Sequence, residues 1–531
     1  MEFELVLPWS ISRVLLTITA ALTLYSSSLV IYRLFIHPLR KIPGPWYVAA
    51  TSWYEFYQDV VLGGNYVKQY PRLHARYGPV VRVSPDRIHV NDPDFFHEVY
   101  SPGSLYLKDP HFFQTSGGIS EALPALVDPD YHKRRRRMIN SLFSAKSIDQ
   151  LAPIVLGVIK RALNKAAESH EKKKPLDIQR LYTGVTIDTI MRVLCDEQLY
   201  LIEAEEEEPP FMATLRTFSA NFFLMKHIPI LTMLAANMPT RLSEWLVPGD
   251  AQFRKKVTEW IEKREDKHRQ GIKTAEDGRK TILDLLLQPE DGSTPLRKAS
   301  VVDETYSFCF AGTHTTSLTI SMATYYLLKN PEKLEQLLEE LKGVKENSQG
   351  MLEYRDICRL PYLVSTHLVI CLRGKRIASE WTTYLTHIRN QTAVIKESLR
   401  LSSPVPGVIP RVVPAGGITW AGHFLPEGTS VSIAIRAIHD NPHIFPDPAS
   451  FIPERWLQND SLDHWLVVFG KGSRSCIGLT VAWMELYLCL GNFFAQLDMS
   501  LYNTDESSVQ WNDCGNAMIH RHVKVTVNSV H

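Results

Sequence analysis

With 531 residues, the chain exceeds the roughly 250–300 residues that one hydrophobic core usually supports, so it indicates a large enzyme or two domains. Hydrophobic residues make up 45% and charged residues 22% of the chain, which is typical of a globular protein. The net charge of +1 gives no strong attraction to phosphate groups and excludes nucleic acid as the expected partner.

The amino terminus contains an apolar segment at residues 14–31 that has no charged side chain and is long enough to span a bilayer. Arg33, Arg40 and Lys41 follow it, whereas only Arg13 precedes it, so the positive-inside rule places the rest of the chain in the cytosol. A cleaved signal peptide is the alternative, but no small-residue cleavage site stands out. We therefore predict one membrane anchor.

A small β-rich region follows the anchor, and most of the remaining chain is helical in pattern. Residues 77–83 and 87–90 alternate like two strands, and Asp92-Pro93 then opens a helix. Strand patterns return much later, at 417–420 and 429–433. The expected fold is mainly α with a small β-rich subdomain, preceded by one transmembrane helix.

A basic run, HKRRRR, lies at residues 132–137 at the head of a helical stretch. Such a run usually forms a solvated helix face or a patch that binds nucleic acid. Composition argues against nucleic acid, and the run alone does not show what else it would bind.

A long helical pattern extends from about residue 299 to 329 and ends at Asn330-Pro331. It contains the sequence AGTHTTS at 311–317. Gly312 permits close approach to the helix and a local loosening of it, so that Thr315 can turn its hydroxyl toward a ligand. The structural alternative is a glycine with polar residues at a helix–helix contact.

Glu397 and Arg400 stand three residues apart in a helical pattern, and this spacing places them on one face where they can pair. A solvated salt bridge is the common explanation of such a pair. Downstream, the sequence FIPERW at 451–456 supplies a second arginine, Arg455, that can join them.

Cys476 lies in the sequence FGKGSRSCIG at 469–478, directly before an apolar helical pattern at 479–490. The glycines permit a sharp turn that points N–H groups at the sulfur, and the dipole of the following helix favours a thiolate. A buried structural cysteine is the alternative. The seven cysteines of the chain have no CxxC or zinc spacing, which fits a reducing cytosolic environment.

These segments, in this order, resemble the motifs of the cytochrome P450 superfamily. Residues 469–478 match every fixed position of its haem-binding signature FxxGxRxCxG, and residues 451–456 resemble its PERF segment. Residues 311–317 resemble (A/G)Gx(D/E)T(T/S), with His314 in place of the usual acid. The resemblance implies the cytochrome P450 fold and haem b, with the Cys476 thiolate as the axial iron ligand.

The same resemblance implies roles for individual residues. Phe469 would shield the iron–sulfur bond from water, and Gly478 would belong to the turn at the sulfur. His132 and Arg136 match the family's WxxxR pair, with histidine in place of tryptophan. The implied residues are Thr315, His314 and Gly312 for oxygen activation, Arg474, Arg136, Arg411 and His132 for the haem propionates, and Glu397, Arg400 and Arg455 for a structural cluster behind the haem.

The implied reaction is monooxygenation with O2 and electrons from NADPH. NADPH–cytochrome P450 reductase would deliver the electrons, cytochrome b5 is an additional candidate donor, and exposed arginines of 132–137 would attract an acidic donor surface. The expected walls of a pocket for a hydrophobic substrate are 107–126, 218–223, Phe310, 405–408 and 517–518.

The sequence KIPGP at 41–45 resembles the proline-rich hinge of microsomal members of the family. The expected organisation is therefore an anchor with its flank at 1–40 and a catalytic domain at 41–531, with the anchor in the endoplasmic-reticulum membrane.

The start of the catalytic domain, at residues 37–45, 54–57 and 132–144, is similar to filamentous-fungal members of the trichodiene-oxygenase type. This likeness implies a secondary-metabolite substrate, either a terpenoid or a polyketide. The alternatives are a xenobiotic or fatty-acid hydroxylase, and a catalytically silent haem-binding protein.

One stretch departs from the family pattern, because residues 364–391 intervene between LPYL at 360–363 and the helix of Glu397. A surface-loop insertion is one explanation, since chains tolerate long loops at low entropic cost. The other is an unspliced intron, because valine codons begin with GT and glutamine can be encoded by CAG, the nucleotides that bound introns. Of the two, we favour the intron.

Overall fold

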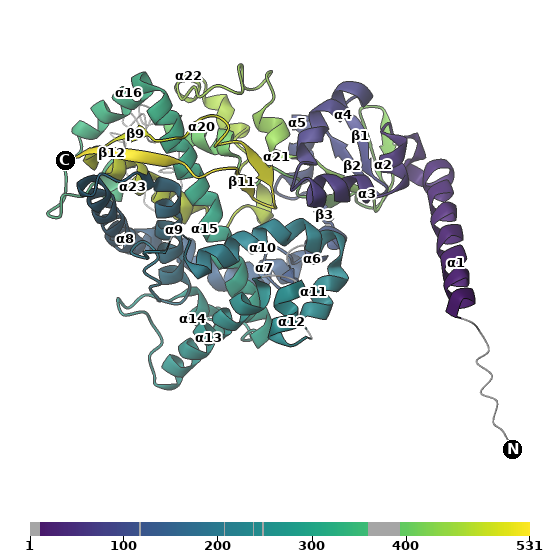
Figure 1. The fold of residues 1–531 in the computed structure, drawn as a ribbon, viewed down its shortest axis with the longest axis horizontal. Coiled ribbons are helices and arrows are strands. Elements are labelled where there is room, and N and C mark those ends of the chain that lie inside the picture. Colours follow the sequence, from purple (N-terminus) through teal and green to yellow (C-terminus); the bar gives the residue numbers. More distant parts are fainter. Residues whose placement is uncertain (1–10, 116–117, 207, 237, 247–248, 359–392) are drawn as a thin grey trace.

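The computed structural model describes residues 11–531 except 116–117, 207, 237, 247–248 and 359–392. Helices form most of the described chain. It also has four small sheets, of which the five-stranded and the three-stranded one lie at opposite ends of the body (Figure 1). The predicted fold, mainly α with a small β-rich part, is confirmed.

The helices of the described chain differ widely in length. They are α1 Ile11–Ile31, α2 Trp46–Ala50, α3 Trp53–Phe56, α4 Tyr70–Tyr77, α5 Pro93–Tyr100, α6 Pro110–Thr115, α7 Pro129–Ile139, α8 Ala145–Glu171, α9 Ile178–Leu194, α10 Pro210–His227, α11 Pro229–Ala236, α12 Thr240–Leu246, α13 Asp250–Arg269, α14 Ile282–Leu287, α15 Lys298–Lys329, α16 Pro331–Lys342, α17 Tyr354–Ile357, α20 Ala393–Ser402, α21 Ile435–His439, α22 Arg455–Gln458 and α23 Leu479–Gln496.

The strands are short. They are β1 Val80–Ser84, β2 Arg87–Val90, β3 Leu107–Lys108, β4 Leu176–Asp177, β5 Arg411–Val412, β6 Ile418–Trp420, β7 His423–Leu425, β8 Ser430–Ser432, β9 Leu497–Leu501, β10 Trp511–Asp513, β11 Ala517–Ile519 and β12 Lys524–Val530.

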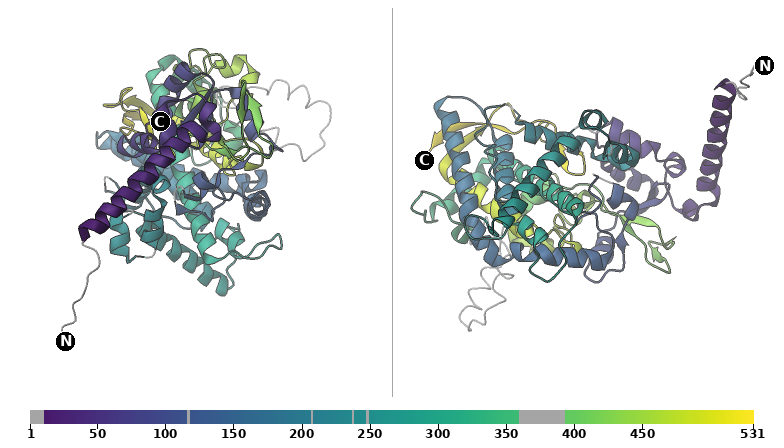
Figure 2. Two further views of the ribbon diagram at one scale, coloured as in Figure 1. Left: turned by 90° about the vertical axis from the view of Figure 1, so that its right-hand side faces the viewer. Right: turned by 90° about the horizontal axis from the view of Figure 1, so that it is seen from below.

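Helix α1 projects away from the body, as Figure 1 and Figure 2 show. The segment Arg13–Ile36 has a mean hydropathy of 1.9 and is unburied, so it is long and apolar enough to cross a membrane. This helix confirms the apolar segment that the sequence predicts at 14–31.

The larger sheet has the strand order β1-β2-β8-β5-β3 and lies next to α1 (Figure 1). Strands β1 and β2 form an antiparallel hairpin whose register shifts between Arg82 and Ser84, and β2 pairs with β8 in parallel. Helix α5 follows directly, and the Asp92 carboxylate caps it by accepting a hydrogen bond from the N–H of Asp94 at 3.0 Å. The predicted strands and helix start are confirmed.

Helix α15 runs through the centre of the helical part and packs against α9, α13, α20 and α23. Ten successive residues, 316–325, are buried, so the helix is enclosed on all sides rather than on one face. The predicted helix at 299–329 is therefore confirmed almost to the residue, and its middle faces the candidate site.

Helix α20 carries Glu397, whose carboxylate is completely buried. It accepts hydrogen bonds from Arg400 at 2.9 and 2.8 Å and from Arg455 at 3.2 Å. The indole of Trp456 adds a further donor at 2.9 Å, and the N–H of Ile452 donates at 3.0 Å. The pair seen in the sequence is thus part of a buried cluster, and the solvated salt bridge is wrong.

Candidate functional site

A cavity of about 460 Å³ lies between α15 and the loop that carries Cys476. Its walls come from segments that are far apart in the sequence, mainly α6 and the loop after it, α9, α15 and the start of α23. Most of the side chains that line it are apolar, among them Phe112, Phe113, Phe222, Phe310 and Val405. These five residues lie in the segments that the sequence predicts as pocket walls. Ala517 and Met518 do not line the cavity, whereas the adjacent Asn516 does.

The loop around Cys476 turns twice through left-handed backbone. Gly470 has φ 65° and Gly472 has φ 70°, and a Cβ at Gly472 would lie 2.7 Å from the carbonyl oxygen of Tyr100. The N–H of Cys476 donates to the carbonyl of Phe469 at 2.8 Å, which closes the loop. Cys476 therefore lines the cavity at the amino-terminal end of α23.

Gly478 departs from the expected turn, because its φ is −81°. A Cβ there would meet nothing nearer than Sγ of Cys476, at 4.0 Å. The glycine is thus not needed for a left-handed turn, and its effect is to keep the space beside the sulfur clear.

The environment of the Cys476 thiol contains opposing influences. Burial raises the pKa of the Cys476 thiol, while the N–H groups of Gly478 and Leu479 and the positive charge of Arg136 lower it. A metal ion coordinated by the sulfur would lower this pKa and favour the thiolate.

Two arginines hold the Cys476 loop against the rest of the site. Arg474 donates to the carbonyl oxygens of Leu126 and Val127 at 2.5 and 2.7 Å. Arg136, from α7, donates to the carbonyl of Ser475 at 2.6 Å. Both guanidinium groups therefore contact neutral carbonyls, and their positive charge is not cancelled by these contacts.

Lys108 and Arg411 add two more buried cations beside Arg474. Burial, Arg474 and Arg411 lower the pKa of Lys108, while burial and Arg411 lower the pKa of Arg474 to about 10. Among the described residues, none of Lys108, Arg136, Arg411 and Arg474 forms an ion pair with a carboxylate. Such uncompensated positive charge fits a group with two carboxylates, which the propionates of a haem provide.

His132 lies among these cations. Burial, followed by the charges of Arg474 and Lys108, lowers the pKa of His132 to about 3. The imidazole is therefore neutral at pH 7, and it could bind a propionate only as a hydrogen-bond donor.

The basic run at 132–137 divides between the interior and the surface. Arg135 is buried and pairs with Glu304 of α15 at 2.5 Å, while Arg136 points to the Cys476 loop. Lys133, Arg134 and Arg137 are exposed. Both interpretations of the whole run, a solvated face and a nucleic-acid patch, are thus too simple, because helical periodicity turns every third or fourth side chain inward.

Helix α15 presents Thr315 to the cavity on the side facing the Cys476 loop. The Thr315 hydroxyl donates to the carbonyl of Ala311 at 2.9 Å. The predicted local loosening at Gly312 is wrong, because α15 continues without a break there. A Cβ at Gly312 would lie 2.8 Å from Cγ1 of Ile190, so the glycine lets α9 pack closely against α15.

His314 does not line the cavity, and its ring contacts Phe310 with centroids 5.8 Å apart. Burial lowers the pKa of His314 to about 4, so the imidazole is neutral at pH 7. A proton relay through His314 stays a prediction, and it would start from the neutral form.

Two charged residues of the site were not predicted. Lys108 carried no signal because a lone lysine in a loop is usually solvated. Glu485 of α23 lines the cavity, and burial raises the pKa of Glu485 well above its usual range, with the nearby Thr316 opposing this. The sequence hinted at a role for Glu485 only through its position, six residues after the start of the helix that follows the glycine-rich loop.

Comparison with known sequences shows to which family a chain with this fold and this site belongs. The sequence model of the family described as Cytochrome P450 matches residues 43–366 and 383–525. The chain therefore belongs to the cytochrome P450 family and is a monooxygenase. The family implies a haem–thiolate cofactor, which agrees with the chemistry of the residues around Cys476.

Among individual proteins, the chain is similar to fungal monooxygenases. It is 59% identical over 514 residues to cytochrome P450 monooxygenase BOT1 of Botryotinia fuckeliana, covering 97% of this chain and 95% of that protein. It is 32% identical to cytochrome P450 monooxygenase aneF of Aspergillus aculeatus, over 91% and 92% of the two chains. It is also 32% identical to an inactive cytochrome P450 monooxygenase, cloA of Claviceps fusiformis, over 96% and 94%. The predicted kinship with fungal members is confirmed.

The family match is interrupted at residues 367–382, which lie within the segment 364–391 that departs from the family pattern. That segment falls outside the described residues, so its origin as a loop insertion or an unspliced intron stays a prediction.

Proposed function

We propose that this monooxygenase oxidises a hydrophobic secondary metabolite, a terpenoid or a polyketide, with a haem b that is ligated by Cys476. The observation that carries the proposal is the Cys476 thiol at the floor of an apolar cavity of about 460 Å³, with Thr315 also lining it. When bound, the haem supplies the activation of O2 and the transfer of one oxygen atom to the substrate.

The residues of the chain divide the remaining tasks. Arg136, Arg411 and Arg474, together with Lys108, would hold the propionates, because these cations have no carboxylate partner of their own among the described residues. Phe469 would cover the sulfur, since its ring lines the cavity and packs against Trp483. The apolar walls exclude water from the reacting centre.

The test is the carbon-monoxide difference spectrum of the reduced protein, followed by product analysis with terpenoid and polyketide substrates. A thiolate-type spectrum and an oxygenated product are expected. A reduced protein that binds haem without that spectrum would contradict the assignment of Cys476.

Replacing Thr315 by alanine is expected to leave the spectrum unchanged and to lower the amount of product formed per NADPH consumed several-fold. The Thr315 hydroxyl lines the cavity and can exchange a proton with its surroundings. The measurement compares product, peroxide and NADPH, with Thr313→Ala as the matched control, because the Thr313 hydroxyl also bonds within α15, to the carbonyl of Cys309, but does not line the cavity. Unchanged coupling in Thr315→Ala would remove Thr315 from the proposed mechanism.

We propose that the chain is anchored in the endoplasmic-reticulum membrane and receives electrons from NADPH–cytochrome P450 reductase, with cytochrome b5 as an additional candidate. Trp46 and Trp53, each 70% exposed, lie in α2 and α3 just after the anchor helix and extend its apolar surface onto the body. The exposed Lys133 and Arg134 would attract an acidic donor.

A catalytically silent protein is the second candidate, and the interruption of the family match at 367–382 favours it. Helix α20, which carries Glu397, begins at Ala393, directly after the predicted insertion, and all of its residues are buried. A segment foreign to the family would therefore enter the fold next to the cluster that stabilises it.

Deleting residues 364–391 is accordingly expected to raise the yield of thiolate-ligated haem protein. The deleted sequence contains apolar side chains that promote aggregation when exposed, and basic ones that oppose burial. The measurement is thiolate-type carbonyl absorbance per mole of protein for both forms expressed side by side, and sequencing of the mature transcript tests the intron. A transcript that retains these codons, combined with lower haem incorporation on deletion, would show that the segment is a structural element.

A further inference from the structure

A second, smaller chamber of about 160 Å³ adjoins the cavity above Cys476. The two spaces share Phe112, Phe222, Val405 and Ile409 as lining residues. The two spaces are therefore adjacent, and a molecule that occupies both would pass between these four side chains. The chamber has four charged residues and a buried tyrosine in its walls, which are Glu55, Asp59, Lys226, Asp513 and Tyr70.

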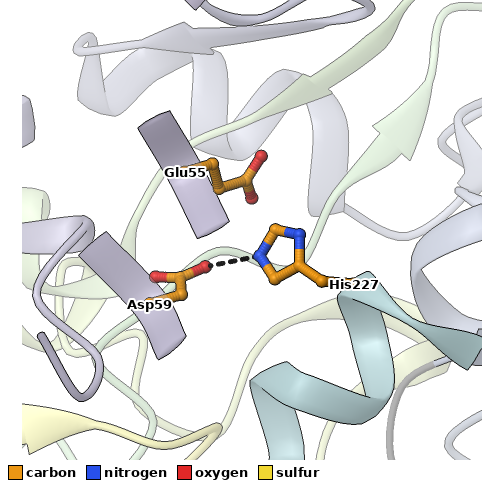
Figure 3. Close-up of side chains that lie close together, drawn as sticks. All are labelled: Glu55, Asp59 and His227. Carbon is orange, nitrogen blue, oxygen red and sulfur yellow. Dashed lines mark hydrogen bonds and ion pairs between the residues drawn. The ribbon is translucent and has the colours of Figure 1, made fainter. Parts of the chain in front are cut away.

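One side of the chamber is closed by a cluster of ion pairs, part of which Figure 3 shows. Asp59 contacts His227 at 3.3 Å, and Glu55 lies beside them. The ammonium group of Lys226 donates to both carboxylates at 2.8 Å, and Arg87 also pairs with Glu55. Glu55, Asp59 and His227 lie close enough together to bind a metal ion, but the ammonium group of Lys226 already bridges the two carboxylates, so we do not infer a metal site there.

Asp513 differs from Glu55 and Asp59, because no cation of the described chain forms an ion pair with it, and only one of its two carboxylate oxygens accepts a hydrogen bond there. It is 6% exposed, and its Oδ1 accepts a hydrogen bond from the N–H of Gly515 at 2.9 Å. Its Oδ2 accepts no hydrogen bond from any of the residues that the structure describes. A Cβ at Gly407 would lie 2.3 Å from Oδ2, so the glycine at this position leaves room for the carboxylate.

Tyr70 provides a second polar group in the same wall. It is 4% exposed, and its ring packs against His89 with centroids 4.2 Å apart. Within the described chain, its hydroxyl has no hydrogen-bond partner. Two nearly buried polar groups, the Tyr70 hydroxyl and the Asp513 carboxyl, thus line a chamber that adjoins the cavity.

Both residues line the chamber, so a molecule bound there can supply the hydrogen bonds that the protein does not. Burial and the nearby Asp59 carboxylate raise the pKa of Asp513 to about 7. The Glu55 and Asp59 carboxylates pair with Arg87 and Lys226. The charges of Lys226 and Lys68 oppose the rise in the pKa of Asp513, but no cation of the described chain forms an ion pair with it. A neutral hydrogen-bond donor fits this environment.

We propose that the Asp513 carboxyl and the Tyr70 hydroxyl bind a hydroxyl group of the substrate, whose apolar body extends into the cavity beside Cys476. The inference rests on the proposed function and narrows it, because the substrate class becomes an apolar alcohol rather than a plain hydrocarbon. An oxygenating or hydrating reaction must then precede this enzyme and install the hydroxyl.

The test compares binding of two probes, the sesquiterpene alcohol cedrol and its methyl ether, which lacks the hydrogen-bond donor. Dissociation constants are measured on the haem-containing protein by the shift of its main absorption band and by thermal stabilisation. Because a hydrogen bond to a charged or strongly polarised group contributes about tenfold or more in affinity, cedrol is expected to bind at least about tenfold more tightly.

Asp513→Leu keeps the branching of the side chain and removes both oxygens, so the preference for cedrol is expected to disappear while the affinity for the ether is retained. Tyr70→Phe is expected to reduce the preference without affecting the fold. The matched control is Asp498→Asn, which changes an exposed aspartate on strand β9 that does not line the chamber.

Equal affinity of the wild-type protein for the two probes would overturn the proposal. An Asp513→Leu variant that still prefers cedrol would also overturn it. A variant whose affinity for both probes falls equally would overturn it as well, because the loss would then come from a changed shape of the chamber rather than from a lost hydrogen bond. If Asp513→Leu does not fold, Tyr70→Phe decides by the same criterion. The carbonyl spectrum of the same preparation tests the haem ligand separately from the alcohol-binding subsite. A thiolate-type spectrum without a preference for cedrol would overturn the subsite and leave the assignment of Cys476 intact.

Discussion

Replacement of Cys476 by serine is expected to abolish both the thiolate-type carbonyl spectrum and turnover. A serine hydroxyl is neutral at physiological pH and cannot supply the electron density that a thiolate gives to iron. The Cys476 side chain is also the thiol that lines the 460 Å³ cavity, so no neighbouring cysteine of the described chain can replace it there. Reduced carbonyl spectra and product formation are measured on purified protein.

Cys358→Ser is the matched control, because Cys358 is half-buried just after α17 and does not line the cavity. The control is expected to retain the spectrum and activity of the wild-type protein. If Cys476→Ser retained both properties as well, the haem ligand would have to be another residue.

Replacement of Glu397 by alanine is expected to give the largest loss of stability. The substitution leaves the guanidinium groups of Arg400 and Arg455 buried without a counter-charge, and it removes the partner of the Trp456 indole. Breaking a buried ion pair in this way costs about 3–5 kcal/mol. The free energy of unfolding in denaturant and the haem content of the purified protein are the measurements.

The matched control removes a carboxylate from an exposed pair, Lys256–Glu259. Glu259→Ala is expected to leave stability essentially unchanged, because solvent screens that pair. Equal unfolding free energies for Glu397→Ala and Glu259→Ala would show that the buried cluster does not stabilise the fold.

Local patterns predicted those features that local sequence determines. The helix at 299–329 could be predicted because no proline interrupts the segment and Pro331 ends it, and the structure places it at 298–329. The pairing of Glu397 with Arg400 followed from a spacing of three residues. Its burial could not be predicted from spacing, since burial depends on Arg455 and Trp456, which arrive from a distant part of the chain.

The same reasoning explains which residues of the site were missed. Lys108, Glu485 and Asp513 are single charged residues in segments without a recognised motif, and such residues are usually solvated. Only tertiary packing encloses them, because each lies where segments from different parts of the chain meet. Conversely, Gly478 was predicted from its motif, but its φ of −81° shows that a motif position does not reveal why a glycine is needed.

The four cations beside the Cys476 loop also bear on how much folded enzyme a cell can maintain. On the proposed assignment, the haem-free chain confines Lys108, Arg136, Arg411 and Arg474 together without counter-ions, so mutual repulsion opposes its folding. Haem binds the native chain and not the unfolded one, so its binding free energy is added to native stability by mass action. The abundance of this enzyme is therefore coupled to the supply of haem, and chains made faster than haem would be left to proteolysis.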